Sequence, residues 1–221
     1  MSPSASTQAL FQSIYDTGRW GRSGDPQDRY FSGLGTRAPH VAGPYVSQVR
    51  SFLSYFSLIA GRLPDVVDLG CGDFTIGTQL RFGCGRYVAC DIVAPLIEFN
   101  RSKYRDADVE FVVLDVCEGD LADGDVALVR QVFQHLSNDQ ISRALSKIVE
   151  RFDFLVLTEH LPADLDFTPN REIPRVGDWR VAEGSGVVLT APPFNLEPKA
   201  SMPLLDLSPG LGRIVTTLYR L

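Results

Sequence analysis

The sequence has no run of about 18 consecutive apolar residues, so we expect no segment of it to span a membrane. Its first residues, MSPSASTQALFQ, lack a basic start followed by an apolar run, so we expect no secretory signal peptide. The four cysteines, Cys71, Cys84, Cys90 and Cys117, form no C-x-x-C pair and accompany no paired histidines. We therefore expect reduced thiols in the core of a cytoplasmic protein, with no metal site.

Clusters of Lys and Arg are also missing. The 221 residues contain 21 Lys and Arg against 27 Asp and Glu, which gives a formal net charge of -6. Nucleic acids and anionic membrane surfaces are bound by clustered basic side chains, so we expect neither as a partner. Hydrophobic residues make up 44% of the chain, an ordinary value for a soluble globular protein of one domain with an appendage.

Three regions of the chain differ in pattern. Residues 1–45 are rich in Gly, Pro, Ser and Arg but contain spaced aromatics, which disordered tails lack, so we expect a partly helical arm or lid. Residues 45–59 carry one apolar stripe at helical spacing and predict a helix. Residues 46–221 would then form the main domain. Within it, the proline-rich segment 161–200 has little periodicity, and we expect an insertion on the substrate side, because long irregular loops are usually functional.

Strand and helix patterns alternate from Pro64 onward. The strand-like runs are short and almost entirely apolar, which is typical of a parallel sheet covered by helices on both faces. A helix is predicted after the fourth run, with Ser137 or Asn138 as its N-cap. The last run, GRIVTTLYRL, follows the turn residues Ser208-Pro209-Gly210 and predicts an antiparallel closing strand paired with SMPLLDL. The runs predicted to be parallel are DVVDLG, RYVACD, VEFVVLD, DVALVR and FDFLVLTEH.

Acidic side chains lie at the ends of the first three predicted strands, at Asp68, Asp91 and Asp115. Ligands of open α/β sheets bind outside the carboxyl ends of the strands. Asp91 follows the glycine loop by about 20 residues, where a carboxylate accepts hydrogen bonds from both hydroxyls of a ribose. Asp115 is placed to accept a hydrogen bond from the exocyclic amine of an adenine. The pattern therefore predicts a ligand that contains adenosine.

The loop VVDLGCGDFTIG distinguishes between adenosine-containing ligands. Gly70 and Gly72 allow a sharp turn and a close backbone approach, while Cys71 between them needs only to be small. A dinucleotide fingerprint would place Gly or Ala where Thr75 stands, and Asp73 would repel a pyrophosphate. An NAD-dependent oxidoreductase is therefore disfavoured. A sulfonium that carries an amino acid group suits the acidic loop better, and S-adenosylmethionine is such a molecule.

These segments resemble the class I S-adenosylmethionine-dependent methyltransferases. The resemblance runs from Pro64 to about His160 through VVDLGCGDF, YVACDI, VEFVVLDV and DVALVRQVFQHLSNDQI. It implies a Rossmann-like, doubly wound fold with a mostly parallel sheet. The chain is also similar to a small subgroup that carries one motif before the domain and another near the end. In this chain those motifs are Tyr15, Trp20 and SGLGT at 32–36, then Asn170, Ile173-Pro174, GDWR at 177–180 and PPFN at 192–195.

The resemblance also implies which residues hold the cofactor. The acids and the glycine turn would hold it from the methionine end to the adenine edge, residues 32–36 would close over it, and Gln131 would line the methyl pocket. Arg130 would either contact the cofactor or pair with a neighbouring acid. The candidate cofactor-binding residues are Asp68, Gly70, Cys71, Gly72 and Asp73 for the loop, Asp91 and Ile92 for the ribose and adenine, Asp115 and Val116 for the adenine, Arg130 and Gln131 for the methyl side, and Arg50 for the methionine carboxylate.

Two histidines are candidates for a general base, because a neutral histidine accepts a proton near pH 7. His135 is the first candidate and His160 the second, and a structural role is the alternative for both. A carboxylate acceptor would need no base. Glu159, Trp179, Arg180 and Asn195 are candidates for contacts with the acceptor, with plain fixing of the loop as the alternative.

The sequence therefore predicts an S-adenosylmethionine-dependent methyltransferase that acts, as a monomer or homodimer, on a small-molecule or sugar-type acceptor. The acidic charge disfavours a nucleic-acid acceptor, and the segment 161–200 is long enough to cover a compact pocket. A protein that binds S-adenosylmethionine or S-adenosylhomocysteine without catalysis has the same cofactor motif, so the motif does not separate the two functions.

Overall fold

One seven-stranded sheet organises residues 3–221, the part of the chain that the computed structural model describes. The strands follow the order β3-β2-β1-β4-β5-β7-β6, with β1 to β5 parallel, β7 antiparallel to β5, and β6 antiparallel to β7. The predicted α/β fold with an antiparallel closing strand is confirmed. The strands are β1 (Val66–Leu69), β2 (Tyr87–Asp91), β3 (Glu110–Val113), β4 (Val126–Arg130), β5 (Phe154–Leu161), β6 (Ala200–Gly210) and β7 (Gly212–Arg220).

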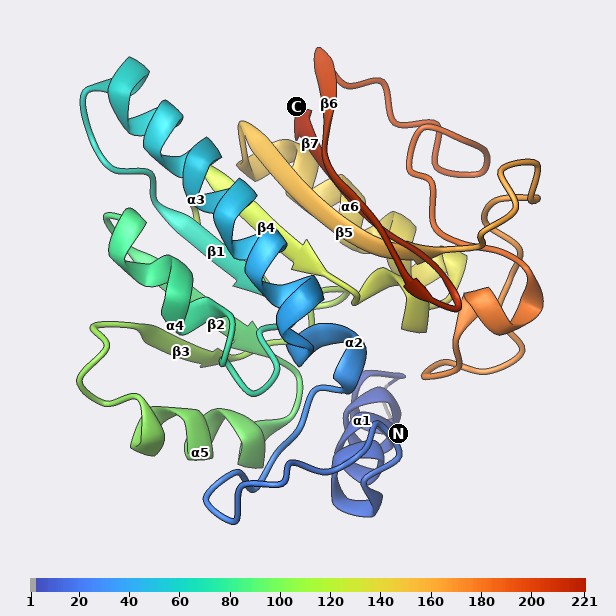
Figure 1. The fold of residues 1–221 in the computed structure, drawn as a ribbon, viewed down its shortest axis with the longest axis horizontal. Helices are drawn as coiled ribbons and strands as arrows, with labels where there is room; N and C mark the ends of the chain where they lie inside the picture. Colours follow the sequence, from blue (N-terminus) through green and yellow to red (C-terminus); the bar gives the residue numbers. More distant parts are fainter. Residues whose placement is uncertain (1–2) are drawn as a thin grey trace.

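Helices cover both faces of the sheet (Figure 1). The apolar stripe of α3 and the buried residues of α4 pack with one set of sheet side chains, and the stripe of α6 packs with the other. The four residues of β1, at the centre of the sheet, are all buried, which explains their nearly uniform apolar sequence. The helices are α1 (Pro3–Thr17), α2 (Leu34–Arg37), α3 (Pro39–Ala60), α4 (Gly77–Leu80), α5 (Ala94–Lys103) and α6 (Asn138–Arg151), with short 3-10 turns at η1 (Arg81–Gly83), η2 (Phe133–His135) and η3 (Arg180–Glu183).

Local sequence signals set the ends of the two longest sheet-covering helices. Ser137 is the N-cap of α6, and its side chain and that of Gln140 each bond the other's backbone N–H in a capping box, which confirms the predicted N-cap. The helix α3 begins at Pro39 rather than at the predicted residue 45, because proline at the first helical position leaves no N–H unsatisfied. The predicted boundary between residues 45 and 46 therefore falls inside a helix.

The N-terminal arm packs against the body of the protein at the carboxyl ends of β1 and β4 (Figure 1). Its aromatic and aliphatic side chains Phe11, Ile14 and Tyr30 are buried in the same apolar cluster as the inner face of α6. The partly helical arm that its aromatics predict is therefore present. No helix in residues 3–221 is long and apolar enough to cross a membrane.

Segment 161–200 contains η3 as its helical element and is otherwise irregular. Two buried polar side chains hold it in place. Asn170 accepts a hydrogen bond from Val188 N at 2.9 Å and donates to Val188 O at 2.9 Å. Arg180 is fully buried and donates to Leu136 O at 2.6 Å and to Arg171 O. The segment is thereby tied both to itself and to the start of α6.

Candidate functional site

A cavity of about 710 Å³ opens at the carboxyl ends of the parallel strands. Its walls come from α1, the arm before α3, the loops after β1, β2, β3 and β4, the residues just before η3, and the turn between β6 and β7. Its volume lies in the range of about 300–1,000 Å³ that is typical of ligand pockets. The cavity therefore lies at the edge of the sheet that the sequence predicted to bind the ligand.

The two glycines of the loop after β1 have no room for a side chain. Gly70 has φ 86°, and a Cβ there would lie 2.4 Å from Val132 Cγ2. Gly72 has φ 54°, and a Cβ there would lie 2.4 Å from Ser32 Oγ. Gly70 N and Cys71 N both donate to Cys90 O at 2.8 Å, which fixes the turn against β2. The loop thus presents bare backbone to the cavity.

Asp91, the last residue of β2, is buried and lines the cavity. Its carboxylate accepts hydrogen bonds from Gly72 N at 3.1 Å and from Val93 N at 3.0 Å. Burial raises the pKa of Asp91 to about 6, against the opposing effect of these bonds. A carboxylate has more acceptor positions than these two donors use, so Asp91 retains capacity for a ligand hydroxyl.

Asp68 and Arg130 lie on the neighbouring central strands and line the same cavity. Asp68 accepts a hydrogen bond from Tyr87 Oη at 3.0 Å, and burial raises its pKa to about 7. The guanidinium carbon of Arg130 lies 4.6 Å from the centre of the Tyr45 ring, and Arg130 Nη2 donates to Thr36 O at 2.9 Å. Arg130 Nε is buried and has no hydrogen-bond partner among the described residues. Buried donors are normally hydrogen-bonded, and a bound anionic group would accept a hydrogen bond from this one.

Asp115 lies just beyond β3 and lines the cavity together with its neighbour Val116 and with Ile92 from the loop after β2. Asp115 is only partly buried, and its Oδ1 accepts a hydrogen bond from Cys117 N at 2.9 Å. One carboxylate oxygen of Asp115 therefore binds the backbone of its own turn. One carboxylate oxygen remains for a ligand.

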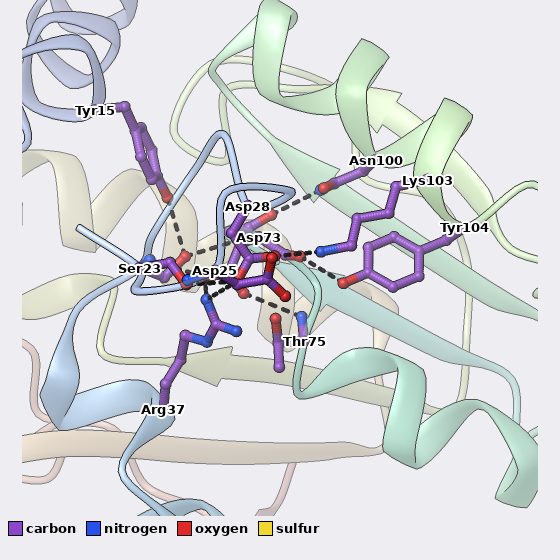
Figure 2. A network of polar contacts seen from close by, with 12 residues as sticks. Tyr15, Ser23, Asp25, Asp28, Arg37, Asp73, Thr75, Asn100, Lys103 and Tyr104 are labelled. Atoms are coloured by element: carbon purple, nitrogen blue, oxygen red, sulfur yellow. Dashed lines mark hydrogen bonds and ion pairs between the residues drawn. The ribbon is translucent and has the colours of Figure 1, made fainter.

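The arm is bonded to the glycine loop through Ser32 and Asp73. Figure 2 shows Asp73 among its neighbours Thr75 and Tyr104. Ser32 N donates to Asp73 Oδ2 at 2.8 Å, and Asp73 N donates to Ser32 Oγ at 2.9 Å. Asp73 Oδ1 also accepts from Thr75 N at 3.1 Å, and Tyr104 Oη donates to Asp73 O at 3.1 Å. The sequence suggested that this carboxylate faces the ligand, but in the structure both of its oxygens bind the protein's own backbone.

A second carboxylate, Asp28, ties the base of the arm to the rest of the protein. It accepts from Arg37 Nη1 at 2.8 Å, from Lys103 Nζ at 2.6 Å and from Ser23 Oγ at 2.8 Å (Figure 2). Desolvation raises the pKa of Asp28, but these donors outweigh it and hold the pKa well below its usual value. Because Lys103 belongs to α5, the arm is bonded both to the glycine loop and to a helix of the sheet domain.

His135 lines the cavity, but both of its ring nitrogens are engaged by the protein. Nδ1 lies 2.9 Å from Asp178 O, so it carries the proton and donates. Nε2 lies 3.2 Å from Gln134 Nε2 and accepts from that amide. Burial lowers the pKa of His135 to about 4, so the ring is neutral. With this arrangement His135 has no free lone pair to accept a proton.

His160 also lines the cavity and has a different hydrogen-bonding pattern. Its Nε2 donates to Leu211 O in the turn between β6 and β7. The remaining lone pair is therefore on Nδ1, which bonds to no described residue. The Trp179 ring lies 5.0 Å from the imidazole, edge to face, and burial lowers the pKa of His160. His160 thus meets the geometric requirement for a base better than His135.

Of the other predicted residues, Gln131 and Trp179 line the cavity. Gln131 accepts from Thr36 Oγ1 at 2.8 Å, which closes residues 32–36 over the end of β4. Four predicted site residues do not line this cavity. Arg50 is exposed on α3 beside a second, shallower depression; Glu159 is buried within β5; Arg180 is fully buried and bonded to backbone carbonyls; Asn195 is exposed and donates to Pro193 O.

Three aromatic residues of the cavity wall were not predicted to line it. The sequence marked Tyr15 and Trp20 only as parts of a motif, and Phe11 only as one of the aromatics that recur in the arm. Phe11, Tyr15 and Trp20 come from α1 and the turn after it and enter the cavity wall. Their rings pack together, with Trp20 lying 6.2 Å from Phe11 and 5.1 Å from Tyr15. Aromatic spacing predicted an ordered arm but did not indicate which way the rings face.

Residues 66–152, from the start of β1 to the end of α6, match the family model described as a methyltransferase domain. Among solved structures, the chain is similar to the bifunctional kinase-methyltransferase WbdD, with a TM-score of 0.61 and 18% identity over 86% of this chain and 42% of WbdD. It is similar to the N-methyltransferase NodS from Bradyrhizobium japonicum WM9, with a TM-score of 0.55 and 15% identity over 80% of this chain and 97% of NodS.

It is also similar to magnesium protoporphyrin IX methyltransferase (ChlM) from Synechocystis PCC 6803 with bound S-adenosylmethionine, with a TM-score of 0.59 and 16% identity over 100% of this chain and 98% of ChlM. A search of curated proteins finds no match. The chain spans less than half the length of WbdD. At these identities the solved structures show a shared fold.

The fold and the domain match together define the class of protein: a Rossmann-like α/β fold in which residues 66–152 match a methyltransferase domain. The matched segment includes every glycine and acid that the sequence assigned to the cofactor, from Asp68 to Val116.

Proposed function

We propose that the chain transfers a methyl group from S-adenosylmethionine to a small-molecule acceptor bound in the cavity at the strand ends. The observation that carries this proposal is the convergence of Asp68, Asp91 and Asp115 with the two space-limited glycines on one cavity. In this assignment Asp91 binds the ribose hydroxyls and Asp115 the adenine amine. Ile92 and Val116 flank the adenine, as the resemblance implies.

The residues present also fit the methionine end of the cofactor. Gly70 and Gly72 both line the cavity and present only backbone to it, so a ligand can approach the loop closely there. Arg130 lines the cavity and has a buried nitrogen without a partner, whereas Arg50 does not reach the cavity. We therefore assign the cofactor carboxylate to Arg130 and not to Arg50. Asp68 supplies negative charge near the cofactor's cationic groups.

The bound cofactor supplies an electrophilic methyl group on a sulfonium. The chain's own contribution is to hold the acceptor atom in line with the S–CH₃ bond at about 3–3.5 Å and to keep water out. Gln131, held by Thr36 at the end of β4, lies where the resemblance places the methyl pocket. The closed arm covers that end of the cavity.

For a hydroxyl acceptor, we assign the base to His160 Nδ1. With S-adenosylmethionine bound, its sulfonium would supply the methyl group and sulfur would keep the electron pair of the S–C bond, while His160 Nδ1 would take the proton of the acceptor hydroxyl. His135, the first candidate from sequence, instead serves to hold Asp178 and Gln134 through its two ring nitrogens. Its neutral ring then forms part of the wall.

The test is calorimetric titration with S-adenosylhomocysteine, followed by incubation with methyl-labelled S-adenosylmethionine and a panel of acceptors. We expect saturable one-site binding and label transfer to at least one small-molecule acceptor. Failure of S-adenosylhomocysteine to bind would overturn the proposal. Tight binding with no transfer to any acceptor would favour the non-catalytic alternative.

A further inference from the structure

Three exposed apolar side chains surround the opening of the cavity. Leu34 is 73% exposed, Trp179 is 39% exposed and Leu211 is 77% exposed, and all three line the cavity. They come from α2, from the residues just before η3, and from the turn between β6 and β7. Single exposed leucines need no explanation, but apolar side chains from three distant segments at one opening indicate a binding surface.

Aromatic rings continue this surface into the cavity. The Trp20 ring lies 5.2 Å from the His135 ring and 6.2 Å from Phe11, and the His160 ring lies 5.0 Å from Trp179. The two groups are joined, because His135 donates to the carbonyl of Asp178, the neighbour of Trp179. An acceptor that enters between Leu34, Trp179 and Leu211 therefore meets flat apolar faces.

The two arginines that line this cavity are not free to bind an anionic acceptor in the proposed complex. Arg19 forms an ion pair with Asp178 at 2.8 Å, and Arg130, which stacks on Tyr45 and donates to Thr36 O, has its unpaired Nε assigned to the cofactor carboxylate. His135 and His160 both have pKa values lowered by burial, so neither is a cation near neutral pH. The remaining formal charges on the cavity wall are carboxylates on the cofactor side. With the cofactor bound, an anionic acceptor would therefore find no unpaired arginine on the part of this wall that the structure describes.

Several polar groups of this part of the wall are bonded to one another, and Gln134 Oε1 is left as a single buried acceptor without a partner among residues 3–221. Thr36 Oγ1 donates to Gln131, the Gln134 amide donates to His135, and His160 Nε2 donates to Leu211 O. A sugar presents several hydroxyls, and each one buried without a partner costs about 1–3 kcal/mol. The wall therefore suits an acceptor with few polar atoms.

From these observations we infer that the acceptor is an uncharged molecule with a flat aromatic or similarly apolar body and one nucleophilic hydroxyl. The inference rests on the proposed methyl transfer. The flat body lies against Trp20 and Trp179, its apolar edge emerges between Leu34 and Leu211, and its hydroxyl faces His160 Nδ1. The expected acceptor, a small molecule or a sugar-type compound, is thereby narrowed to an apolar small molecule.

The test uses the full chain saturated with S-adenosylhomocysteine and three probes. 2-Naphthol has the inferred chemistry, 2-naphthoate adds a negative charge to the same ring system, and glucose replaces the apolar body with hydroxyls. We expect 2-naphthol to bind at least tenfold more tightly than either of the others. Equal or tighter binding of 2-naphthoate or glucose, or no binding of 2-naphthol to the saturated protein, would overturn the inference. Failure of S-adenosylhomocysteine itself to bind would instead refute the proposed function.

Variants then locate the bound probe. We expect Trp179→Ala to weaken 2-naphthol binding at least tenfold and Trp179→Phe to restore most of it, with unchanged affinity for S-adenosylhomocysteine. Tyr55→Ala is the matched control, because Tyr55 is 65% exposed on α3 and does not line the cavity. In the same way Leu211→Ser is compared with Leu58→Ser, at a site 79% exposed on α3. Equal effects in the variants and their controls would contradict the assigned surface.

Discussion

Ser32 and Asp73 each donate a backbone N–H to the other's side chain, at 2.8 and 2.9 Å, and so join the N-terminal arm to the cofactor loop. The same Ser32 hydroxyl occupies the space that a Cβ at Gly72 would need. The arm therefore closes onto the part of the loop where the cofactor is expected to lie. Closure of the arm and binding of the cofactor are thereby linked through one pair of residues.

We predict that Asp73→Ala opens the arm. The substitution removes an acceptor of two backbone N–H groups, and a hydrogen bond to a charged group contributes about 1.5–3 kcal/mol. Hydrogen exchange at the amides of residues 20–37 should accelerate, and S-adenosylhomocysteine should dissociate at least several-fold faster. Asp106→Ala, at an exposed carboxylate in a weak surface ion pair, is the control. Unchanged exchange in the arm of the Asp73 variant would contradict the coupling.

We predict that Asp91→Ala weakens binding of S-adenosylmethionine at least tenfold. The carboxylate is expected to accept from both ribose hydroxyls, and it also holds the loop through Gly72 N and Val93 N. Asp91→Asn keeps an acceptor oxygen and should give a smaller loss. Calorimetry measures both, with Asp123→Ala at an exposed site as control. Wild-type affinity in a folded Asp91→Ala protein would exclude the ribose role.

We predict that Glu159 makes the protein less stable as the pH rises. Burial raises the pKa of Glu159 to about 8, against the opposing effects of Arg180 and of backbone hydrogen bonds, so the folded state binds a proton that the unfolded state releases near its ordinary pKa of about 4.3. The folded state thus holds more protons between these two values, and its stability falls as pH rises through that window. Glu159→Gln should flatten the dependence and raise the melting temperature at pH 8 more than at pH 5. Parallel melting curves for the two proteins across this range would refute the prediction.

We predict that the two histidines respond differently to the same substitution. His160→Gln should lower kcat for a hydroxyl acceptor by roughly 10²–10⁴-fold, the usual contribution of a general base, without changing affinity for S-adenosylhomocysteine. It should also remove the rise of kcat with pH that protonation of His160 imposes below neutrality. His135→Gln should retain that rise in the pH profile, because both ring nitrogens of His135 are engaged by the protein. The reverse result would return the role of base to His135.

The sheet and the cofactor side of the cavity followed from the sequence because the signals are local. Strands such as Val126–Arg130 are short apolar runs, and Asp91 is placed by its position at a strand end. The acceptor side depended on contacts between distant residues. Asp178 and Gln134 occupy both ring nitrogens of His135, so His135 has no lone pair free to act as a base. Only folding brings Asp178 next to it. Arg180 was expected to contact the acceptor but bonds to backbone carbonyls instead, and a motif alone does not distinguish the two.

Trp179 and Arg180 are adjacent in sequence but have opposite surroundings, since Arg180 is fully buried and Trp179 is partly open to solvent at the cavity. The Arg180 guanidinium holds the segment in place by donating to Leu136 O and Arg171 O. These hydrogen bonds do not involve the side chain at position 179. Position 179 is therefore a place where selectivity for one acceptor over another can be re-engineered by saturation mutagenesis, while its neighbour must be left intact for the scaffold to hold.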